Sequence, residues 1–339
     1  MHDINLIPKR EILWNVAGPI NVAIFYAIFI LSLFVCCYGF YRRYLLWNSG
    51  RSDKSRRGNF LERAKILFSA IALQKTVNRD KEVKYFHAPI FYGFLVLLFT
   101  TTMVFIDQDL GIKIYQGDFY LLVTVFSDLF GLLLIIGLFK AIHRRTIKRP
   151  DKLHNTNADF VMLYLLLLMC VQGFALEAIR VEVTNDNWRA YSFVANFLSH
   201  SLWVFSDSAL STIHFTLWWI HSITVFFFIA YIPYSKFFHL FTSGLNLYLQ
   251  QLEHPKGALN YAGDIEEILE KAAESTSDDA FSFGIEKIKD LSWKQILDLD
   301  SCTSCGRCQE VCPAYNSGKA LSPKWLILDS RNHLLKLHT

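Results

Sequence analysis

Residues 211–233 read STIHFTLWWIHSITVFFFIAYIP, a stretch without a single Lys, Arg, Asp or Glu. A bilayer core about 30 Å thick requires about 20 apolar residues in a helix, because only a helix or a closed barrel satisfies its own backbone polar groups in lipid. The stretch therefore predicts a membrane-spanning helix. It also contains His214 and His221, polar side chains that lipid disfavours and that mark a candidate functional site.

Four further apolar stretches resemble this one, so the sequence predicts an all-α membrane protein with a five-helix transmembrane bundle. A shorter apolar run, 190–205, is interrupted by polar residues and predicts an interfacial or re-entrant helix. Residues 60–71 carry apolar side chains at helical spacing among basic ones, which predicts an amphipathic helix on the membrane surface or against the soluble part of the chain. The five predicted spans are 19–41, 86–106, 119–142, 160–179 and 211–233.

The composition agrees with a membrane protein. The 339 residues are 53% hydrophobic and only 19% charged, which excludes an ordinary soluble enzyme and a disordered chain. The net charge of +4 arises from unevenly placed Lys and Arg, so we expect a lipid membrane and no nucleic acid as partner.

The distribution of Lys and Arg predicts the orientation. Segments 42–85 and 143–159 hold twelve and five of these residues, whereas 107–118 and 180–210 hold one and two. Basic loops stay on the cytoplasmic side. We therefore expect a multi-pass protein of a bacterial or archaeal cytoplasmic (inner) membrane, with the N-terminus outside and the chain after the fifth span in the cytoplasm.

The histidines of the second and fifth spans predict a haem. His214, His221 and His239 are separated by 7 and 18 residues, close to whole helical turns, so a helix continuing to residue 239 would place all three on one face. Imidazoles from two facing helices hold a b-type haem in a bundle. His87 opens the second span on the same side as His239, which predicts one haem b between these two. The alternative is that both are interfacial histidines engaged in hydrogen bonds.

A second haem would need a partner for His221 or His214. Position 97, ten residues after His87, is Leu, and the second span holds no other histidine. His200 is the nearby imidazole that remains. The alternatives are an interfacial His214 beside an aromatic belt and a solvated His200.

Two acids and an amide fall within predicted spans. Asp128 lies in the third span, and Gln172 and Glu177 lie toward the end of the fourth. Buried acids in a bundle can relay protons to a quinone. A neighbouring serine or a water molecule can equally satisfy them.

Four cysteines close together predict an iron–sulfur cluster. Cys302, Cys305, Cys308 and Cys312 precede Pro313 in the pattern C-x2-C-x2-C-x3-C-P, the bacterial ferredoxin spacing for a [4Fe–4S] cluster. Zinc is the weaker alternative because zinc sites seldom space four cysteines so tightly. In two-cluster domains the fourth cysteine serves the other cluster. Either Cys312 closes a single cluster, or a continuation of the chain or a partner supplies a second run, which we expect.

Residues 20–246 resemble the membrane cytochrome b of the respiratory nitrate reductase gamma type, with five helices and haem histidines on helices two and five. The two-haem pattern of that type has a further histidine on helix two, which this sequence lacks. Residues 292–333, with LDLDSCTSCGRC (297–308) and GKALSPKW (318–325), resemble the start of the heterodisulfide reductase-related iron–sulfur oxidoreductases. The combination is similar to membrane oxidoreductases that pass electrons between electron-transfer flavoprotein and menaquinone, in which a second cluster motif and cysteine-rich domains follow.

The resemblance implies three segments: a transmembrane cytochrome b domain (1–246), a cytoplasmic linker and helix (247–291) and an iron–sulfur segment (292–339). It implies a membrane subunit that moves electrons between a cytoplasmic partner, an electron-transfer flavoprotein or a heterodisulfide reductase-like subunit, and menaquinone or ubiquinone. One alternative is a quinol-oxidising anchor that feeds a cytoplasmic reductase. Another is a non-catalytic membrane anchor without haem.

Overall fold

The computed structural model describes residues 7–53, 56, 58–252, 264–274, 285 and 287–337. In these ranges the secondary structure is helical apart from two isolated β-bridges. The chain divides into two compact units. The first comprises Met1–Tyr38 and Gln74–Phe237, and the second comprises Gly39–Leu73 and Phe238–Thr339.

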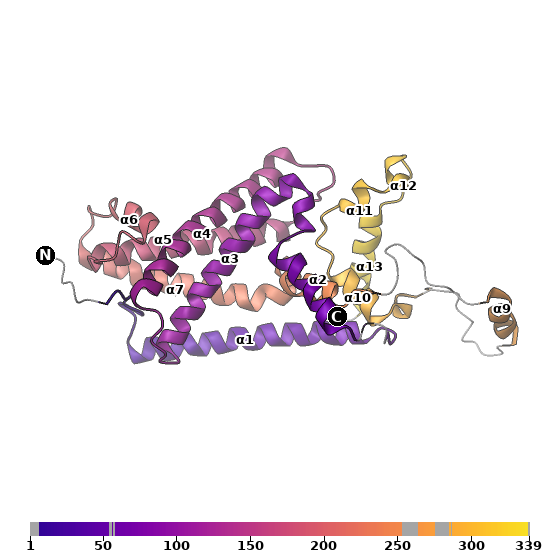
Figure 1. The fold of residues 1–339 in the computed structure, drawn as a ribbon, viewed down its shortest axis with the longest axis horizontal. Coiled ribbons are helices and arrows are strands. Elements are labelled where there is room, and N and C mark those ends of the chain that lie inside the picture. Colours follow the sequence, from indigo (N-terminus) through magenta and orange to yellow (C-terminus); the bar gives the residue numbers. More distant parts are fainter. Residues whose placement is uncertain are drawn as a thin grey trace. The chain divides into compact units, whose positions relative to one another are not determined.

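Five helices are long and apolar enough to cross a membrane, which confirms the predicted spans. Each begins or ends beyond the apolar stretch that predicts it, because capped polar turns continue the helix. Asp80, for example, accepts a hydrogen bond from the Val83 amide (3.3 Å), and Thr156 and Asp159 form a capping box. The five are α1 (Pro19–Asn48), α3 (Lys81–Gln108), α4 (Gly117–His143), α5 (Asn157–Val183) and α7 (Asp207–Tyr231) (Figure 1).

The remaining helices are shorter. The predicted interfacial run contains one helix, α6, which covers only Phe193–Ser199. The predicted amphipathic helix is α2, Phe60–Ala72. The others are α8 (His239–Tyr248), α9 (Ile265–Glu274), α10 (Trp293–Asp300), α11 (Arg307–Glu310), α12 (Pro313–Asn316) and α13 (Pro323–Leu337).

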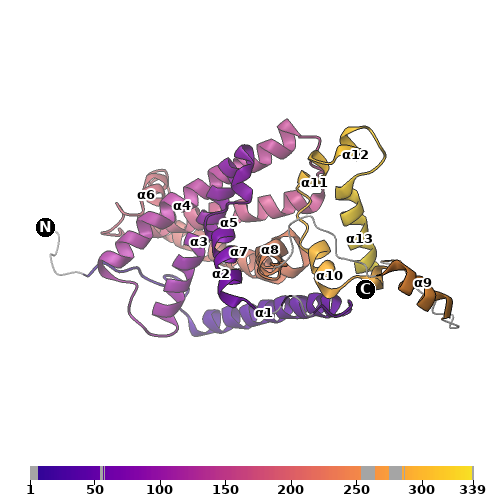
Figure 2. The same ribbon diagram turned by 45° about the vertical axis from the view of Figure 1, so that its right-hand side comes forward.

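Helices α3 and α4 of the first unit lie side by side in both ribbon views (Figure 1, Figure 2). Two glycines allow this close approach. A Cβ atom at Gly93 would lie 2.6 Å from Cβ of Leu134, and one at Gly137 would lie 2.8 Å from the carbonyl oxygen of Phe86. Small residues at such positions bring helix backbones together where lipid offers no hydrophobic driving force.

Aromatic side chains join the first part of α1 to α7. The ring of Phe25 lies 5.2 Å from that of Trp218 and 5.0 Å from that of Phe226. Ahead of α1, the Asn15 amide donates a hydrogen bond to the Ser211 carbonyl (2.7 Å). Residues 7–38 therefore contact α7 through their side chains.

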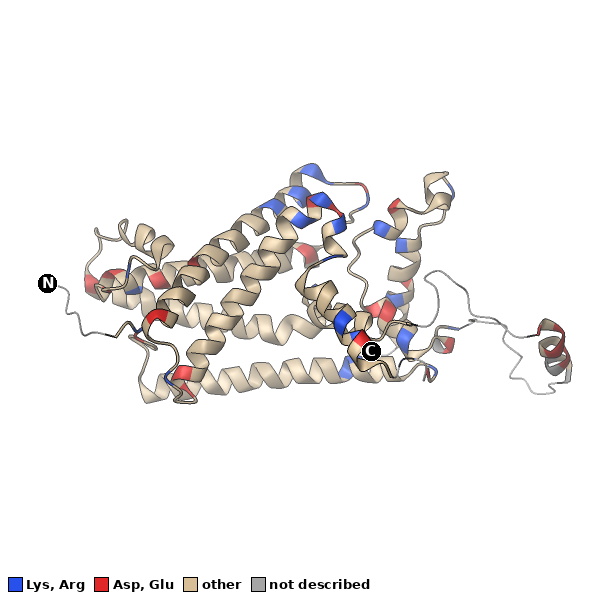
Figure 3. Cartoon of the chain, in the orientation of Figure 1, with Lys and Arg blue, Asp and Glu red and all other residues tan. Residues whose placement is uncertain are grey.

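Basic residues of the first unit gather where α3 and α5 begin and α4 ends (Figure 3). Glu82 pairs with Arg144 (3.2 Å) and Lys148 (2.7 Å). The fully buried Asp159 pairs with Arg145 (3.0 Å) and Lys236 (2.6 Å). These ion pairs tie the ends of four helices together.

The continuous helix expected from His221 to His239 is wrong. Helix α7 ends at Tyr231, two 3-10 turns follow at Ile232–Tyr234 and Lys236–Phe238, and α8 begins at His239. Pro233 lacks a backbone N–H, and the backbone of Ser235 is extended (φ −127°, ψ 177°). Helical spacing therefore relates His214 to His221 but not to His239.

The second unit contains the end of α1 together with α2 and α8 to α13. Its core includes Leu46, Ile296 and Leu334. Helix α2 packs on α8, and the buried Arg63 donates hydrogen bonds to the Tyr248 and Gln250 carbonyls (2.7 Å each). Within this unit, α2 therefore packs on α8, and both expectations for α2 stay predictions.

The boundaries of the two compact units differ from those of the three predicted segments, because residues 39–73 group with the C-terminal helices. Three parts of the expected linker, 253–263, 275–284 and 286, lie outside the described residues.

Candidate functional site

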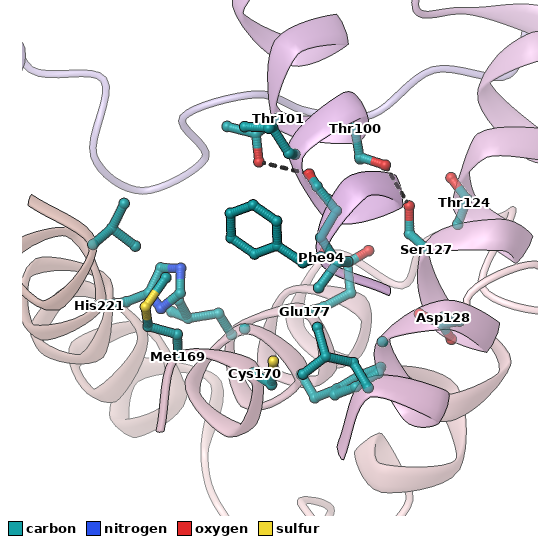
Figure 4. Close-up of a pocket in the computed structure, with 18 of the residues that line it drawn as sticks. Phe94, Thr100, Thr101, Thr124, Ser127, Asp128, Met169, Cys170, Glu177 and His221 are labelled. Atoms are coloured by element: carbon teal, nitrogen blue, oxygen red, sulfur yellow. Dashed lines mark hydrogen bonds between the residues drawn. The ribbon is translucent and has the colours of Figure 1, made fainter. Parts of the chain in front are cut away.

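A cavity of about 480 Å³ lies in the first unit, among α3, α4, α5 and α7. The volume is typical of small-molecule and cofactor sites. Figure 4 shows His221 and Met169 on one side, Thr100 and Ser127 on the other, and Phe94 between them. The hydroxyl groups of Thr100 and Ser127 are 2.7 Å apart. The lining is mostly apolar, and its ionisable side chains include Arg10, Asp128, Glu177, His214 and His221.

Two of the predicted histidines line this cavity from α7. His221 Nδ1 lies 3.3 Å from Oε1 of Gln172 on α5. The ring of Trp14 packs edge-on against His214 at 4.6 Å, and His214 is only 5% exposed. Among the residues that the structure describes, no hydrogen-bond partner reaches His214 Nδ1.

The cavity does not bring His200 to either of these histidines. His200 is exposed, and its Nδ1 lies 2.6 Å from the Asn196 carbonyl in its own turn. Among the described residues around the cavity, His214 and His221 are the two histidines, and α3 contributes Leu97. Two imidazoles on one helix, about 10 Å apart along its axis, cannot face one iron from opposite sides. The lining therefore does not fit a haem with two histidine ligands.

Both predicted acids line the cavity, and both have partners. The carboxylate of Asp128 accepts a hydrogen bond from the Val194 amide (2.7 Å). Glu177 pairs with Arg10 and Arg180 at 2.8 Å each, and the Ser192 hydroxyl donates to it (3.3 Å). A proton-relay role for these acids stays a prediction.

The segment before α1 supplies cavity residues that sequence reasoning misses. Arg10 lines the cavity, Val16 is buried and the Pro8 carbonyl accepts a hydrogen bond from the Gly117 amide (2.7 Å). Tyr115, after α3, also lines the cavity. Burial raises the pKa of the Tyr115 phenol, although Arg10 opposes this, so the hydroxyl stays protonated at neutral pH.

The predicted haem pair falls in two different units. His87 lies in the second turn of α3 in the first unit, where its ring stacks on Phe91 with centroids 6.4 Å apart. His239 is the first residue of α8 in the second unit. The pairing of His87 with His239 stays a prediction.

The four cysteines of the second unit suit an iron–sulfur cluster by their chemistry. All are free thiols at or near the surface, and positive φ at Ser304 (59°) and Gly306 (76°) turns the backbone between them. In the ranges that the structure covers, no three His, Cys, Asp or Glu side chains are assembled as a site for a single metal ion. Four soft ligands at ferredoxin spacing are the donor set that such a cluster needs. This set comprises Cys302, Cys305, Cys308 and Cys312.

The cysteine segment is fixed to its neighbours within the second unit. Asp300, two residues before Cys302, accepts hydrogen bonds from Arg43 (3.1 Å) and from Nε1 of Trp47 (2.9 Å) at the end of α1. Arg331 of α13 donates to the Cys302 carbonyl (2.9 Å).

Helix α8 also meets the cysteine segment. The Ser301 hydroxyl, next to Cys302, lies 3.3 Å from the carbonyl oxygen of Thr242. Thr242 is three residues beyond His239 on the same helix. The helix that starts with a predicted haem ligand therefore contacts the predicted cluster segment.

Two known protein families match parts of this chain. Residues 83–253 match the nitrate reductase gamma subunit family over half of the chain. The chain belongs to that family. Residues 293–314 match the 4Fe-4S binding domain, so a gamma subunit domain and an iron–sulfur domain are joined in one chain, as the resemblance predicts.

Two curated relatives are longer oxidoreductases that match most of this chain. The EtfAB:quinone oxidoreductase of Syntrophomonas wolfei is 31% identical over 323 residues, which are 91% of this chain and 43% of the relative. A probable iron-sulfur-binding oxidoreductase of Bacillus subtilis is 29% identical over 283 residues, 81% of this chain and 37% of the relative. The chain thus spans about two fifths of the length of these relatives.

A smaller relative matches a shorter part of the chain. It is one subunit of the dihydromethanophenazine:CoB–CoM heterodisulfide reductase of Methanosarcina acetivorans, 24% identical over 200 residues, 57% of this chain and 68% of the relative. No solved structure matches the chain. Family, helices and relatives agree on a multi-pass, membrane-anchored iron–sulfur electron-transfer protein related to oxidoreductases.

Proposed function

We propose that this chain is the membrane electron-transfer part of a quinone oxidoreductase. It moves electrons between a soluble redox partner on the cytoplasmic side and menaquinone or ubiquinone in the bilayer. The observation that carries the proposal is the contact between the cysteine segment and α8, the helix that begins with His239.

The proposed cofactor ligands lie in both units. A [4Fe–4S] cluster on the four cysteines and a haem b on His87 and His239 would, when bound, each supply a one-electron carrier. Asp300 holds the cysteine segment at the end of α1 through Arg43 and Trp47. These contacts lie within the second unit, which carries both the cysteine segment and His239.

The basic residues at one end of the first unit support a cytoplasmic position for that end. The α7 helix ends at the same place, since Lys236 pairs with Asp159 at the start of α5. The C-terminal iron–sulfur segment follows α7 in the chain and lies in the cytoplasm in this proposal.

The relatives support a flavoprotein donor. The relative named EtfAB:quinone oxidoreductase is similar to this chain over 91% of its length. The reverse direction, quinol oxidation for a soluble reductase, is the second candidate, because other relatives are named as parts of a heterodisulfide reductase. We favour the first because the heterodisulfide reductase relatives match under 60% of the chain.

An assay of the protein reconstituted in vesicles that contain menaquinone tests the proposal. Reduced electron-transfer flavoprotein is added outside, and menaquinol formation is followed. We expect menaquinol to form with the wild type and with His143→Ala, whose parent side chain is exposed at the end of α4. Menaquinol formation should be lost in His239→Ala and in Cys308→Ser. Equal menaquinol formation in all four proteins would contradict the proposal.

The reverse assay separates the two directions. Vesicles loaded with menaquinol are supplied with a soluble disulfide as acceptor, and thiol formation is measured. Thiol formation that requires Cys308, without any menaquinol formation from the flavoprotein, would replace the first candidate by the second.

A further inference from the structure

We propose that the cavity of the first unit binds the ring of a lipid-borne quinone, with His214 as the hydrogen-bond partner of one quinone carbonyl. The inference rests on the proposed function and names the place where that function meets its membrane substrate. It assigns the cavity to a neutral, flat molecule that carries two carbonyl acceptors.

The walls of the cavity suit a neutral ring. Phe94, Leu134, Phe174 and Phe228 line it from four different helices, and its volume of about 480 Å³ lies in the small-molecule range. The cationic lining residue is Arg10, and its charge is already met by Glu177 at 2.8 Å. An anionic ligand would therefore find no uncommitted positive charge among the described lining residues.

His214 supplies a polar group that lacks a partner. Its side chain is 5% exposed, lines the cavity and keeps Nδ1 buried without a hydrogen bond in the described part of the chain. A buried polar atom in this state is costly, and native structures normally satisfy it with protein, water or ligand. A ligand carbonyl in the cavity would satisfy the Nδ1–H tautomer.

The cavity opens on the lipid-facing side of α3. Leu98, 51% exposed, and the exposed Thr101 both contribute to the lining from the second half of this membrane-spanning helix. Both residues fall within the predicted apolar span 86–106, and exposed side chains within such a span face hydrocarbon in a bilayer. The ligand that reaches this opening is therefore one that dissolves in lipid.

Gly173 gives a way to fill the cavity without disturbing its walls. It lines the cavity, and a Cβ atom built on it meets nothing within 4 Å. Gly173→Leu should therefore occupy ligand space while α5 keeps its packing. Val171→Leu is the matched control, because Val171 is 50% exposed on the same helix and does not line the cavity.

The test measures binding of a short-tailed naphthoquinone to the protein in lipid nanodiscs by quenching of tryptophan fluorescence. Trp218 lines the cavity and Trp14 packs on His214, so both report occupancy. We expect saturable quenching for wild type and Val171→Leu. The apparent Kd should rise by more than about tenfold in Gly173→Leu, and by about threefold to tenfold in His214→Leu, the loss of one hydrogen bond.

The haem content of each variant is measured in parallel. We expect the same haem per chain in wild type and Gly173→Leu, because the cavity lacks paired imidazoles. Loss of haem in Gly173→Leu with unchanged naphthoquinone binding would make the cavity a haem site and overturn the proposal.

The outcomes separate this inference from the proposed function. Equal Kd values in wild type, Gly173→Leu and His214→Leu would place the quinone elsewhere and overturn the inference, while the vesicle assay would still report electron transfer. Absence of saturable binding to the wild type, together with absence of menaquinol formation in vesicles, would overturn both.

Discussion

Arg180, near the end of α5, holds two acids in the first unit, so its replacement by Met should destabilise that unit strongly. Its side chain is 4% exposed, and Nη2 lies 2.8 Å from Glu177 and 2.7 Å from Asp186. Removing one partner of a buried ion pair costs about 3–5 kcal/mol. Glu177 retains Arg10 at 2.8 Å, so the loss falls mainly on Asp186, whose side chain is 8% exposed. We therefore expect a loss of about 3–4 kcal/mol in the free energy of unfolding.

Lys148→Met is the matched exposed case. Lys148 pairs with Glu82 at 2.7 Å, both side chains are about half exposed (53% and 50%), and Glu82 likewise retains a second cation, Arg144. Exposed ion pairs contribute about 0–1 kcal/mol, so this variant should stay close to the wild type. The two free energies of unfolding are measured by circular dichroism during SDS titration of the protein in mixed micelles.

The double variant Arg180→Met/Asp186→Leu supplies the internal check. It removes the acid that Arg180→Met leaves buried, and replacement of a whole buried pair by apolar groups is often nearly neutral. The double variant should therefore recover most of the lost free energy of unfolding. A difference below about 1 kcal/mol between Arg180→Met and Lys148→Met would refute the reasoning that burial decides the contribution of these pairs.

Three further changes test the packing and the cysteine segment. Gly93→Ala should lower the free energy of unfolding by about 1–3 kcal/mol, because the new Cβ would lie 2.6 Å from Cβ of Leu134. Gly173→Ala should be tolerated, because a Cβ atom there meets nothing within 4 Å. Similar midpoints of the two variants in the SDS titration would contradict this. Cys308→Ser should abolish the electron paramagnetic resonance signal of the reduced cluster and leave haem absorbance intact; an unchanged signal would remove this cysteine from the ligand set. Asp300→Ala removes the hydrogen-bond acceptor of Arg43 and Trp47, which should lower the free energy of unfolding by about 1–3 kcal/mol. Amide hydrogen exchange in residues 293–301 should therefore become faster. Unchanged exchange would show that these hydrogen bonds do not hold the segment.

The five spans and the cysteine motif are predictable because each signal is local. Lipid burial depends on the summed hydropathy of about 20 consecutive residues, and cluster ligands recur at fixed short spacing. Sequence reasoning also identifies His214 and His221 as neighbours on one helix face, and both line the cavity.

The end of α7 is less predictable. The apolar pattern continues past Pro233, but the two 3-10 turns and the extended Ser235 depend on how the chain packs after the helix. The expected common face of His221 and His239 fails for this reason.

Long-range contacts are beyond the reach of one sequence. Arg10 reaches Glu177, and Asp300 reaches Arg43 and Trp47 across more than 250 residues of chain. Lone charged residues give no local signal of their partners.

We propose that His87 and His239 hold a haem b that exchanges electrons with a cluster on the cysteine segment. The most direct test is the reduced-minus-oxidised absorption spectrum of the purified protein, with haem and iron quantified per chain. We expect a b-type α-band that disappears in His239→Ala and in His87→Ala and persists in His143→Ala. A wild-type spectrum without this band, or a full band in both histidine variants, would contradict it.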